Sequence, residues 1–367
     1  MSPEADRRFM ALAIALGARG LGSVWPNPAV GCVIVRGGRI VGRGWTQPGG
    51  RPHAETVALS QAGALARGAT AYVSLEPCSH HGQTPPCAVA LIGAGITRVV
   101  SAMTDPDARV SGRGHVLLRA AGVEVSEGVL GGVAAAANAG FLARIRDGRP
   151  LVTLKLALSL DGRIANAAGA SRWITGPEAR RRVHALRARH DAVMVGIGTA
   201  LADDPELTVR DLGAVTQPVR VVLDSRLRLP LHSRLVRGAR AVPLWVLHCG
   251  DARPAGAALE REGVRLIRTG SDATGRIAIR AALQSLGEAG LTRVFCEGGA
   301  QVAAALLGGG HVDTLIGFSA GRVFGAEGTA SVGPVSGAAE LSDVSEFERV
   351  SVTGVGADIM HVWRRRV

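Results

Sequence analysis

The chain has 367 residues, of which 47% are hydrophobic and 20% are charged, and this length favours two domains over one. No apolar run is long enough to cross a bilayer, and residues 1–4 lack a signal-peptide pattern, so we expect neither a membrane protein nor a secreted one. The five cysteines are few, odd in number and scattered. They favour a reducing compartment with thiols free to bind metal, and we expect the cytoplasm.

The formal charge of +12 comes almost entirely from arginine. The arginines are spread over both halves of the chain, which suits phosphorylated small molecules better than nucleic acid. A general preference for arginine explains the charge equally well. Lys155 is the single lysine. Because lysine carries a compact point charge rather than a planar guanidinium, we expect a function at this position that arginine cannot serve.

The first half of the chain alternates strand and helix patterns. Strands are expected at 29–35, 40–45, 71–75, 99–103 and 123–125, and helices at 4–20, 53–66, 87–92, 116–120 and 131–138. This alternation predicts an α/β fold with helices on both faces of the sheet.

A candidate zinc site lies in the same half. His53, Cys78 and Cys87 would fill three tetrahedral positions and leave the fourth for water. Glu55 lies too close to His53 to be needed as a ligand and is better placed to move protons. The alternative is a closed structural zinc, with His80 or His81 as the fourth ligand. The catalytic interpretation is favoured because Glu55 would have no purpose in a closed site.

Three segments of this half closely resemble the deaminase half of the bifunctional riboflavin-biosynthesis deaminase/reductase family. They are residues 26–35, 52–55 and 76–87. The eight-residue gap between Cys78 and Cys87 is specific to that family. The resemblance implies a cytidine-deaminase-like α/β/α domain, zinc on the three predicted ligands and Glu55 as proton carrier. It also implies a substrate contact from Asn27, although the residues alone favour a simple turn between two prolines there.

The family's substrate is 2,5-diamino-6-ribosylamino-4-pyrimidinone 5′-phosphate, which loses its ring 2-amino group as ammonia. The chain departs from the family pattern at three places expected to line the pyrimidine or phosphate side of the pocket. These are Thr46, Gln83 and the pair Asp107-Ala108.

In the second half, residues 141–150 are interpreted as a polar connector. We place the boundary near Asp147, giving domains 1–147 and 148–367. Strands are expected at 151–158, 192–197, 219–223, 244–247, 264–267, 294–296, 314–319 and 359–363, and helices at 177–190 and 301–307. Gly298-Gly299 lies at a strand-to-helix turn that would receive phosphate, or is simply a tight turn that needs positive φ. No Gly-x-Gly-x-x-Gly motif follows a strand, which disfavours a standard Rossmann domain.

The segments 148–162, 171–176, 196–210 and 297–299 resemble the reductase half of the same family, which is similar to dihydrofolate reductase in fold and uses NADPH. The resemblance gives Lys155 a catalytic role in binding a ribose oxygen. The implied cofactor contacts are Ala157, Trp173, Thr199, Asp203, Ser225 and Gly299. The implied substrate contacts are Ser171, Leu207, Arg210 and Glu297.

The sequence therefore predicts a bifunctional enzyme that deaminates a phosphorylated pyrimidine and then reduces its ribosyl group with NADPH. Its expected partners are this small molecule and a second copy of the chain in a dimer, with no nucleic acid and no membrane. One alternative is a zinc deaminase that acts on nucleic-acid bases. The other is a protein in which one half has lost its activity.

Overall fold

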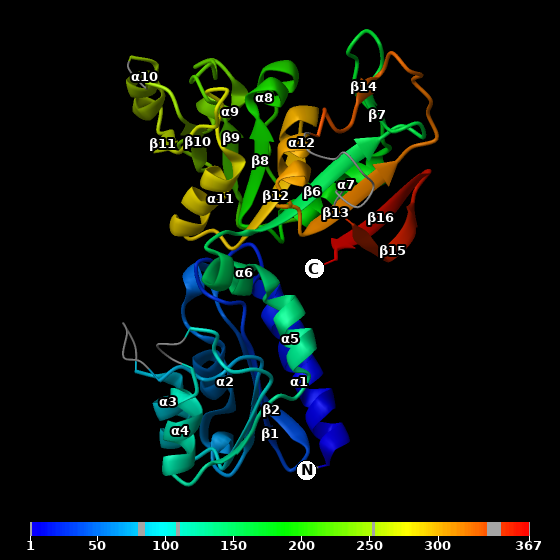
Figure 1. Ribbon diagram of the computed structural model, residues 1–367. Coiled ribbons are helices and arrows are strands. Elements are labelled where there is room, and N and C mark those ends of the chain that lie inside the picture. The colour runs from blue at the N-terminus through cyan, green and yellow to red at the C-terminus, as the bar shows by residue number, and fades with distance from the viewer. Residues whose placement is uncertain (1, 80–84, 108–110, 252–253, 336–345, 367) are drawn as a thin grey trace. The chain divides into compact units, whose positions relative to one another are not determined.

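The computed structural model describes residues 2–79, 85–107, 111–251, 254–335 and 346–366. The chain divides into two compact units, Met1–Asp147 (unit 1) and Gly148–Val367 (unit 2), shown in Figure 1 in blue to cyan and in green to red. Within the described residues, no helix combines the length and the apolar character needed to span a membrane.

Unit 1 is built on a five-stranded mixed sheet with the order β2-β1-β3-β4-β5. Strand β1 pairs antiparallel with β2 and β3, while β3, β4 and β5 run parallel. The strands are β1 (Gly31–Arg36), β2 (Arg39–Trp45), β3 (Thr70–Val73), β4 (Arg98–Ser101) and β5 (Glu124–Ser126). The helices are α1 (Pro3–Gly17), α2 (Ala54–Ala62), α3 (Cys87–Gly93), α4 (Arg113–Ala120), α5 (Gly131–Ala137) and α6 (Ala139–Asp147), with short 3-10 helices η1 (Ala18–Gly20), η2 (Pro48–Gly50) and η3 (Gly63–Ala66).

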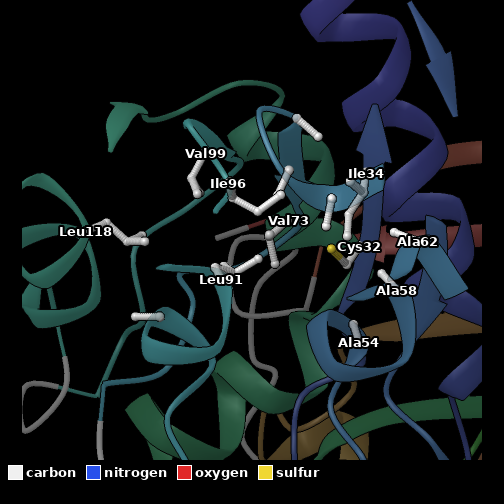
Figure 2. Packing of buried hydrophobic residues seen from close by; sticks show 14 of the residues in the cluster. Cys32, Ile34, Ala54, Ala58, Ala62, Val73, Leu91, Ile96, Val99 and Leu118 are labelled. Carbon is white, nitrogen blue, oxygen red and sulfur yellow. The ribbon is translucent and has the colours of Figure 1, made fainter. Parts of the chain in front are cut away.

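Alternate residues of β1 face two separate apolar clusters, as the two-residue period of a strand requires. Cys32 and Ile34 pack with buried residues of α2, α3 and α4, and Figure 2 shows this cluster from close by. Val33 and Val35 pack with α1 and α5 on the other face. Helices thus cover both faces of the sheet, which confirms the predicted α/β/α arrangement.

Glycines of β2 let α2 lie directly on the strand. A Cβ atom on Gly44 would stand 2.2 Å from the carbonyl oxygen of Ala54, and one on Gly42 would stand 2.2 Å from that of Ala58. Any larger residue would therefore push the helix away. Because α2 begins immediately after His53 and carries Glu55 in its first turn, this close contact fixes the end of the helix that bears both residues.

Unit 2 contains a nine-stranded sheet with the order β11-β10-β9-β8-β12-β6-β13-β16-β15, and a two-stranded sheet of β14 and β7. Strands β11 to β13 in this order run parallel, and β16 and β15 add an antiparallel edge. The strands are β6 (Leu151–Leu158), β7 (Arg163–Ala165), β8 (Ala192–Gly196), β9 (Val219–Leu223), β10 (Leu244–His248), β11 (Arg265–Arg268), β12 (Arg293–Gly298), β13 (Thr314–Ser319), β14 (Thr329–Ala330), β15 (Phe347–Val355) and β16 (Asp358–Arg365).

Two groups of helices in unit 2 pack on one face of its large sheet, since the register sets Val193 of one cluster beside Phe295 of the other. Ala200, Leu235 and Leu259 of α8, α9 and α10 join buried residues of β8, β9 and β10. Ala179 and Val183 of α7 join buried residues of β12, β13 and β16. The helices are α7 (Pro177–Arg187), α8 (Ile197–Asp203), α9 (Arg234–Arg237), α10 (Ala255–Arg261), α11 (Ile279–Glu288) and α12 (Ala300–Gly308).

One expectation about local structure is wrong. Residues 141–150, interpreted as a polar connector, lie mostly in helix α6, where Gly140 and Ala143 are buried. Its arginines suit a helix because their long unbranched side chains lose little rotamer freedom there. Helices α8 to α11 and strands β7, β14 and β15 were not predicted from the sequence.

Candidate active sites

The first candidate site, in unit 1, is a cluster of three potential metal ligands. The ligand atoms of His53, Cys78 and Cys87 all lie within 4.8 Å of one another, the one such group among the described residues. Nδ1 of His53 lies 3.3 Å from Sγ of Cys87 and 3.7 Å from Sγ of Cys78. Tetrahedral zinc with ordinary bond lengths places its ligand atoms roughly 3.6–3.8 Å apart. The donor set and its spacing therefore fit zinc.

Local structure brings the three ligands together. His53 is the N-cap residue of α2, and Cys87 is the first residue of α3. The backbone amide of Cys87 donates a hydrogen bond of 3.3 Å to Sγ of Cys78. Such a hydrogen bond stabilises the thiolate, the form of cysteine that binds zinc. His80 and His81, the alternative fourth ligands, lie outside the described residues.

The surroundings of the cluster shift the protonation of its members. A hydrogen bond with Cys87 lowers the pKa of Cys78 to about 4, while the same pairing raises the pKa of Cys87. A hydrogen bond with Cys78 raises the pKa of His53. Glu55 is 4% exposed, and burial followed by the charge of Cys78 raises its pKa to about 7. Glu55 can therefore hold or release a proton near neutral pH.

Two loops border this cluster. Asn27 lies against Gly50 of the loop that leads to His53. A Cβ atom on Gly50 would stand 1.7 Å from the side-chain nitrogen of Asn27, so only glycine leaves room for this amide. The carboxylate of Glu76 accepts hydrogen bonds from the amides of Asp105, Gly112 and Gly114, which holds the segment after β4 next to the start of the Pro77-Cys78 turn.

The family departures fall in different surroundings. Thr46 is buried, and its hydroxyl accepts a hydrogen bond from the amide of Val30. This side chain therefore stabilises the segment before β1. The amide of Asp107 donates to Asp105 and closes a local turn. Gln83 and Ala108 lie outside the described residues.

The second candidate site, in unit 2, is a cavity of about 1790 Å³. It lies where β6, β8, β9 and β12 end, the edge at which parallel α/β sheets bind ligands. A cavity for one small ligand typically measures about 300–1,000 Å³, so this one has room for a dinucleotide and a second molecule. All eleven residues predicted for the second half line it: Lys155, Ala157, Ser171, Trp173, Thr199, Asp203, Leu207, Arg210, Ser225, Glu297 and Gly299.

A glycine turn forms one wall of this cavity between β12 and α12. Gly298 and Gly299 have φ angles of 77° and 94°, in the region that favours glycine. The hydroxyl of Thr199 donates to the carbonyl of Gly298, and a Cβ atom on Gly299 would stand 2.9 Å from that hydroxyl. Gly298 and Gly299 both line the cavity and carry no side chain, so the turn exposes its backbone to a ligand.

Lys155 and Glu297 face each other across the floor of the cavity. Nζ of Lys155 lies 3.9 Å from a carboxylate oxygen of Glu297, and the two side chains are 15% and 10% exposed. Burial lowers the pKa of Lys155 against the opposing charge of Glu297. Burial raises the pKa of Glu297, but Arg187 and Lys155 outweigh it and hold that pKa below its ordinary value. Glu297 is therefore ionised, and its carboxylate pairs with both Lys155 and Arg187.

Arg187 is a cavity residue that the sequence analysis missed. Its Nε donates to Glu297, and its terminal nitrogen donates to the carbonyl of Thr208 at 2.8 Å. The sequence held a signal for it: Arg187 follows the buried Val183 by four residues in α7, which puts both on one face. An arginine on the buried stripe of a helix needs an anionic partner.

Comparisons with known proteins agree with this geometry. The model of the cytidine and deoxycytidylate deaminase zinc-binding region matches residues 3–103, and the model of the RibD C-terminal domain matches residues 150–360. The riboflavin biosynthesis protein RibD of Escherichia coli (strain K12) is 42% identical over 369 residues, covering 96% of this chain and 98% of that protein. The solved structure of Acinetobacter baumannii RibD, form 1, is 38% identical with a TM-score of 0.90 and covers 100% of both chains.

A third relative is a Thermotoga maritima protein described as a diaminohydroxyphosphoribosylaminopyrimidine deaminase/5-amino-6-(5-phosphoribosylamino)uracil reductase. Its structure is 35% identical with a TM-score of 0.86 and covers 99% of both chains. Fold and sites together thus define a two-unit enzyme that joins a zinc-dependent deaminase to an NADPH-dependent reductase. The chain belongs to the RibD family of bifunctional riboflavin-biosynthesis enzymes. A deaminase for nucleic-acid bases is not favoured.

Proposed function

We propose that residues 1–147 form the deaminase domain and that they remove the ring 2-amino group of 2,5-diamino-6-ribosylamino-4-pyrimidinone 5′-phosphate. Residues 148–367 then reduce the ribosyl group of 5-amino-6-(5-phosphoribosylamino)uracil to ribityl. The name of the Thermotoga maritima relative gives a deaminase and a reductase for these compounds, and its likeness extends over both halves of this chain.

In the deaminase, His53, Cys78 and Cys87 would hold the zinc. Zinc, when bound, acts as a Lewis acid that activates water for attack on the ring carbon. Glu55 takes a proton from the attacking water and passes it to the ring nitrogen. It then carries the remaining proton of the added hydroxyl to the amine, which leaves as ammonia while the ring carbonyl forms. Its pKa of about 7 in the buried site suits both directions of transfer. The amide of Asn27 holds an edge of the pyrimidine ring.

In the reductase, NADPH supplies a hydride to the anomeric carbon when it is bound. Lys155 donates a hydrogen bond to the ribose oxygen and stabilises the charge that develops as the ring opens. Glu297 keeps that ammonium in place, as the 3.9 Å ion pair indicates. Arg210, exposed on the cavity wall, binds the 5′-phosphate with its planar guanidinium.

The remaining cavity residues divide between the two ligands. Ser171 and Leu207 are assigned to the substrate, together with Arg187, which the structure adds to the set. The cofactor residues are Ala157, Trp173, Thr199, Asp203, Ser225 and Gly299. One observation supports the whole proposal: the same chain holds a cluster of three potential zinc ligands and a cavity lined by every predicted reductase residue.

We also propose that the chain forms a dimer in the cytoplasm. The terminal strands β15 and β16 support self-association, because they expose Val350, Val352 and Ile359 at the edge of the large sheet. The cytoplasm is supported by five cysteines that are all free thiols. Light scattering after gel filtration measures the mass in solution, and a monomer would contradict the dimer.

The substrate proposal is tested by comparing three compounds with the zinc-loaded protein: the diaminopyrimidine ribosyl phosphate, deoxycytidine monophosphate and a cytosine-containing RNA oligonucleotide. We expect ammonia release from the first alone. Release from the oligonucleotide at a comparable rate would contradict the proposal and restore the nucleic-acid alternative.

A further inference from the structure

A second, smaller cavity lies in unit 2. It measures about 340 Å³ and is lined by residues of three segments: the stretch after α8, the start of β9 and helix α9 with the turn that follows it. Its charged lining residues are Glu206, Arg220, Arg234 and Arg237. Glu206 and Arg234 also line the large cavity, so the two are neighbours. Neither reaction proposed above uses the smaller one.

Arg220 is the unusual member of this set. It is 1% exposed and is among the largest fully buried side chains of the described residues. One terminal nitrogen donates to the carbonyl of Val242, while Nε has no hydrogen-bond partner. In the part of the chain that the structure describes, no carboxylate forms an ion pair with it within 4 Å. A buried guanidinium left in this state is costly unless an anion compensates it.

The acidic residue of the pocket compensates Arg220 only in part: burial lowers the pKa of Arg220, and the charge of Glu206 offsets this without reversing it. One carboxylate oxygen of Glu206 accepts a hydrogen bond of 2.6 Å from Arg210, and the other is paired with Arg234. Its charge is thus shared between two exposed arginines. Arg237, an exposed residue, adds a further positive charge to the lining. The pocket is therefore lined by three arginines and by one carboxylate that is already engaged, so it keeps an excess of positive charge.

We propose that this pocket, which we name the Arg220 pocket, is an accessory binding site for a phosphate-type oxyanion. The fork of N–H donors on a guanidinium matches the oxygens of a phosphate group, and several arginines converging on one anion are the usual form of such sites. A volume of about 340 Å³ accommodates a phosphate group with a small attached moiety. The ligand is therefore either inorganic phosphate or the phosphate of a small metabolite.

The test measures phosphate binding by isothermal titration calorimetry on the full chain, at constant ionic strength and with NADPH saturating. The background carries Arg210→Gln, which removes the proposed phosphate contact of the large cavity. It also carries Glu206→Gln, because Glu206 would otherwise lose one of its two partners and leave a carboxylate oxygen free at the pocket. Arg237→Gln is then added, because this exposed side chain can change without disturbing the core. Arg268→Gln is the matched control, since Arg268 is an exposed arginine of unit 2 that lines neither cavity.

We expect inorganic phosphate to bind in this background and Arg237→Gln to weaken it by about tenfold, as the loss of one charge-assisted hydrogen bond predicts. Arg268→Gln should leave the affinity unchanged. Titration with ribose 5-phosphate separates the two sources: tighter binding than inorganic phosphate identifies a sugar phosphate, and equal binding identifies the free ion.

A second variant, Arg220→Gln, tests the buried arginine directly, in case the exposed Arg237 contributes little to phosphate binding. It is used with thermal unfolding to show that the protein stays folded, and it should abolish phosphate binding in the same background. No binding in this background, or binding that survives both the Arg237 and Arg220 changes, would overturn the proposal.

Discussion

Replacing Lys155 with methionine should separate the two activities of one chain. Methionine keeps an unbranched stem of similar length but removes the charge that lies 3.9 Å from Glu297. Loss of one preorganised electrostatic contact to developing charge typically costs about 10²–10³ in rate. We therefore expect kcat/KM for NADPH oxidation to fall by at least about 100-fold, which corresponds to roughly 2.7 kcal/mol.

The same change should leave unit 2 folded. Glu297 retains Arg187 as its partner, so no buried carboxylate is left alone. Removing one partner of a buried ion pair is strongly destabilising when the other charge is left uncompensated, and Arg187 prevents that here. Lys155→Arg restores the charge without the shape, and we expect it to be slow as well, because a guanidinium does not replace a compact ammonium.

The assay for these variants has an internal control. Ammonia release from the diaminopyrimidine substrate reports unit 1, while NADPH oxidation with the deaminated substrate reports unit 2. Lys155→Met should bind zinc and release ammonia at the normal rate. Normal NADPH oxidation by this variant would refute the role given to Lys155.

Three further predictions concern other parts of the chain. Glu55→Gln should keep zinc but lower ammonia release by about 10²–10⁴ with NADPH oxidation unchanged, and normal deamination would remove Glu55 from the mechanism. Gly299→Ala places a Cβ atom 2.9 Å from the Thr199 hydroxyl at a φ of 94°, so it should raise KM for NADPH by about tenfold or more, whereas Gly321→Ala, with open space around it, should not. Burial lowers the pKa of His190 to about 3, below its unfolded value of about 6.5, so its contribution to stability is present above pH 6.5 and is lost as the pH falls. Urea unfolding of unit 2 should therefore lose about 2–3 kcal/mol between pH 6.5 and 4.5 from this group, and His190→Gln should reduce that loss; equal pH dependence of both proteins would contradict the reasoning.

The sequence predicts buried structure best. In β1, Cys32 and Ile34 face one layer of helices while Val33 and Val35 face the other, so this strand is apolar throughout and easy to recognise. The candidate zinc ligands could also be predicted, because local patterns place His53 and Cys87 at helix starts and Cys78 shortly after a strand. Their meeting in space is a consequence of the fold and not of spacing alone.

Exposed or polar elements were harder to predict. Strand β15 is mostly exposed at the edge of its sheet, so no buried stripe marks it. In helix α6 the buried residues, Gly140 and Ala143, are small, and the arginines beside them suggested a polar connector instead of a helix. Arg187 was missed because its partner Glu297 lies 110 residues away in the chain, a pairing that only the sheet order brings about.

The most direct test of the bifunctional account follows both products in one reaction. The zinc-loaded protein is mixed with NADPH and the diaminopyrimidine ribosyl phosphate, and ammonia and NADPH are measured over time. We predict that ammonia appears first and that NADPH is then consumed in an equal amount. A zinc chelator should stop both, and added deaminated substrate should restore NADPH consumption but not ammonia release. NADPH consumption without prior ammonia release, or ammonia release that never leads to NADPH consumption, would contradict the account.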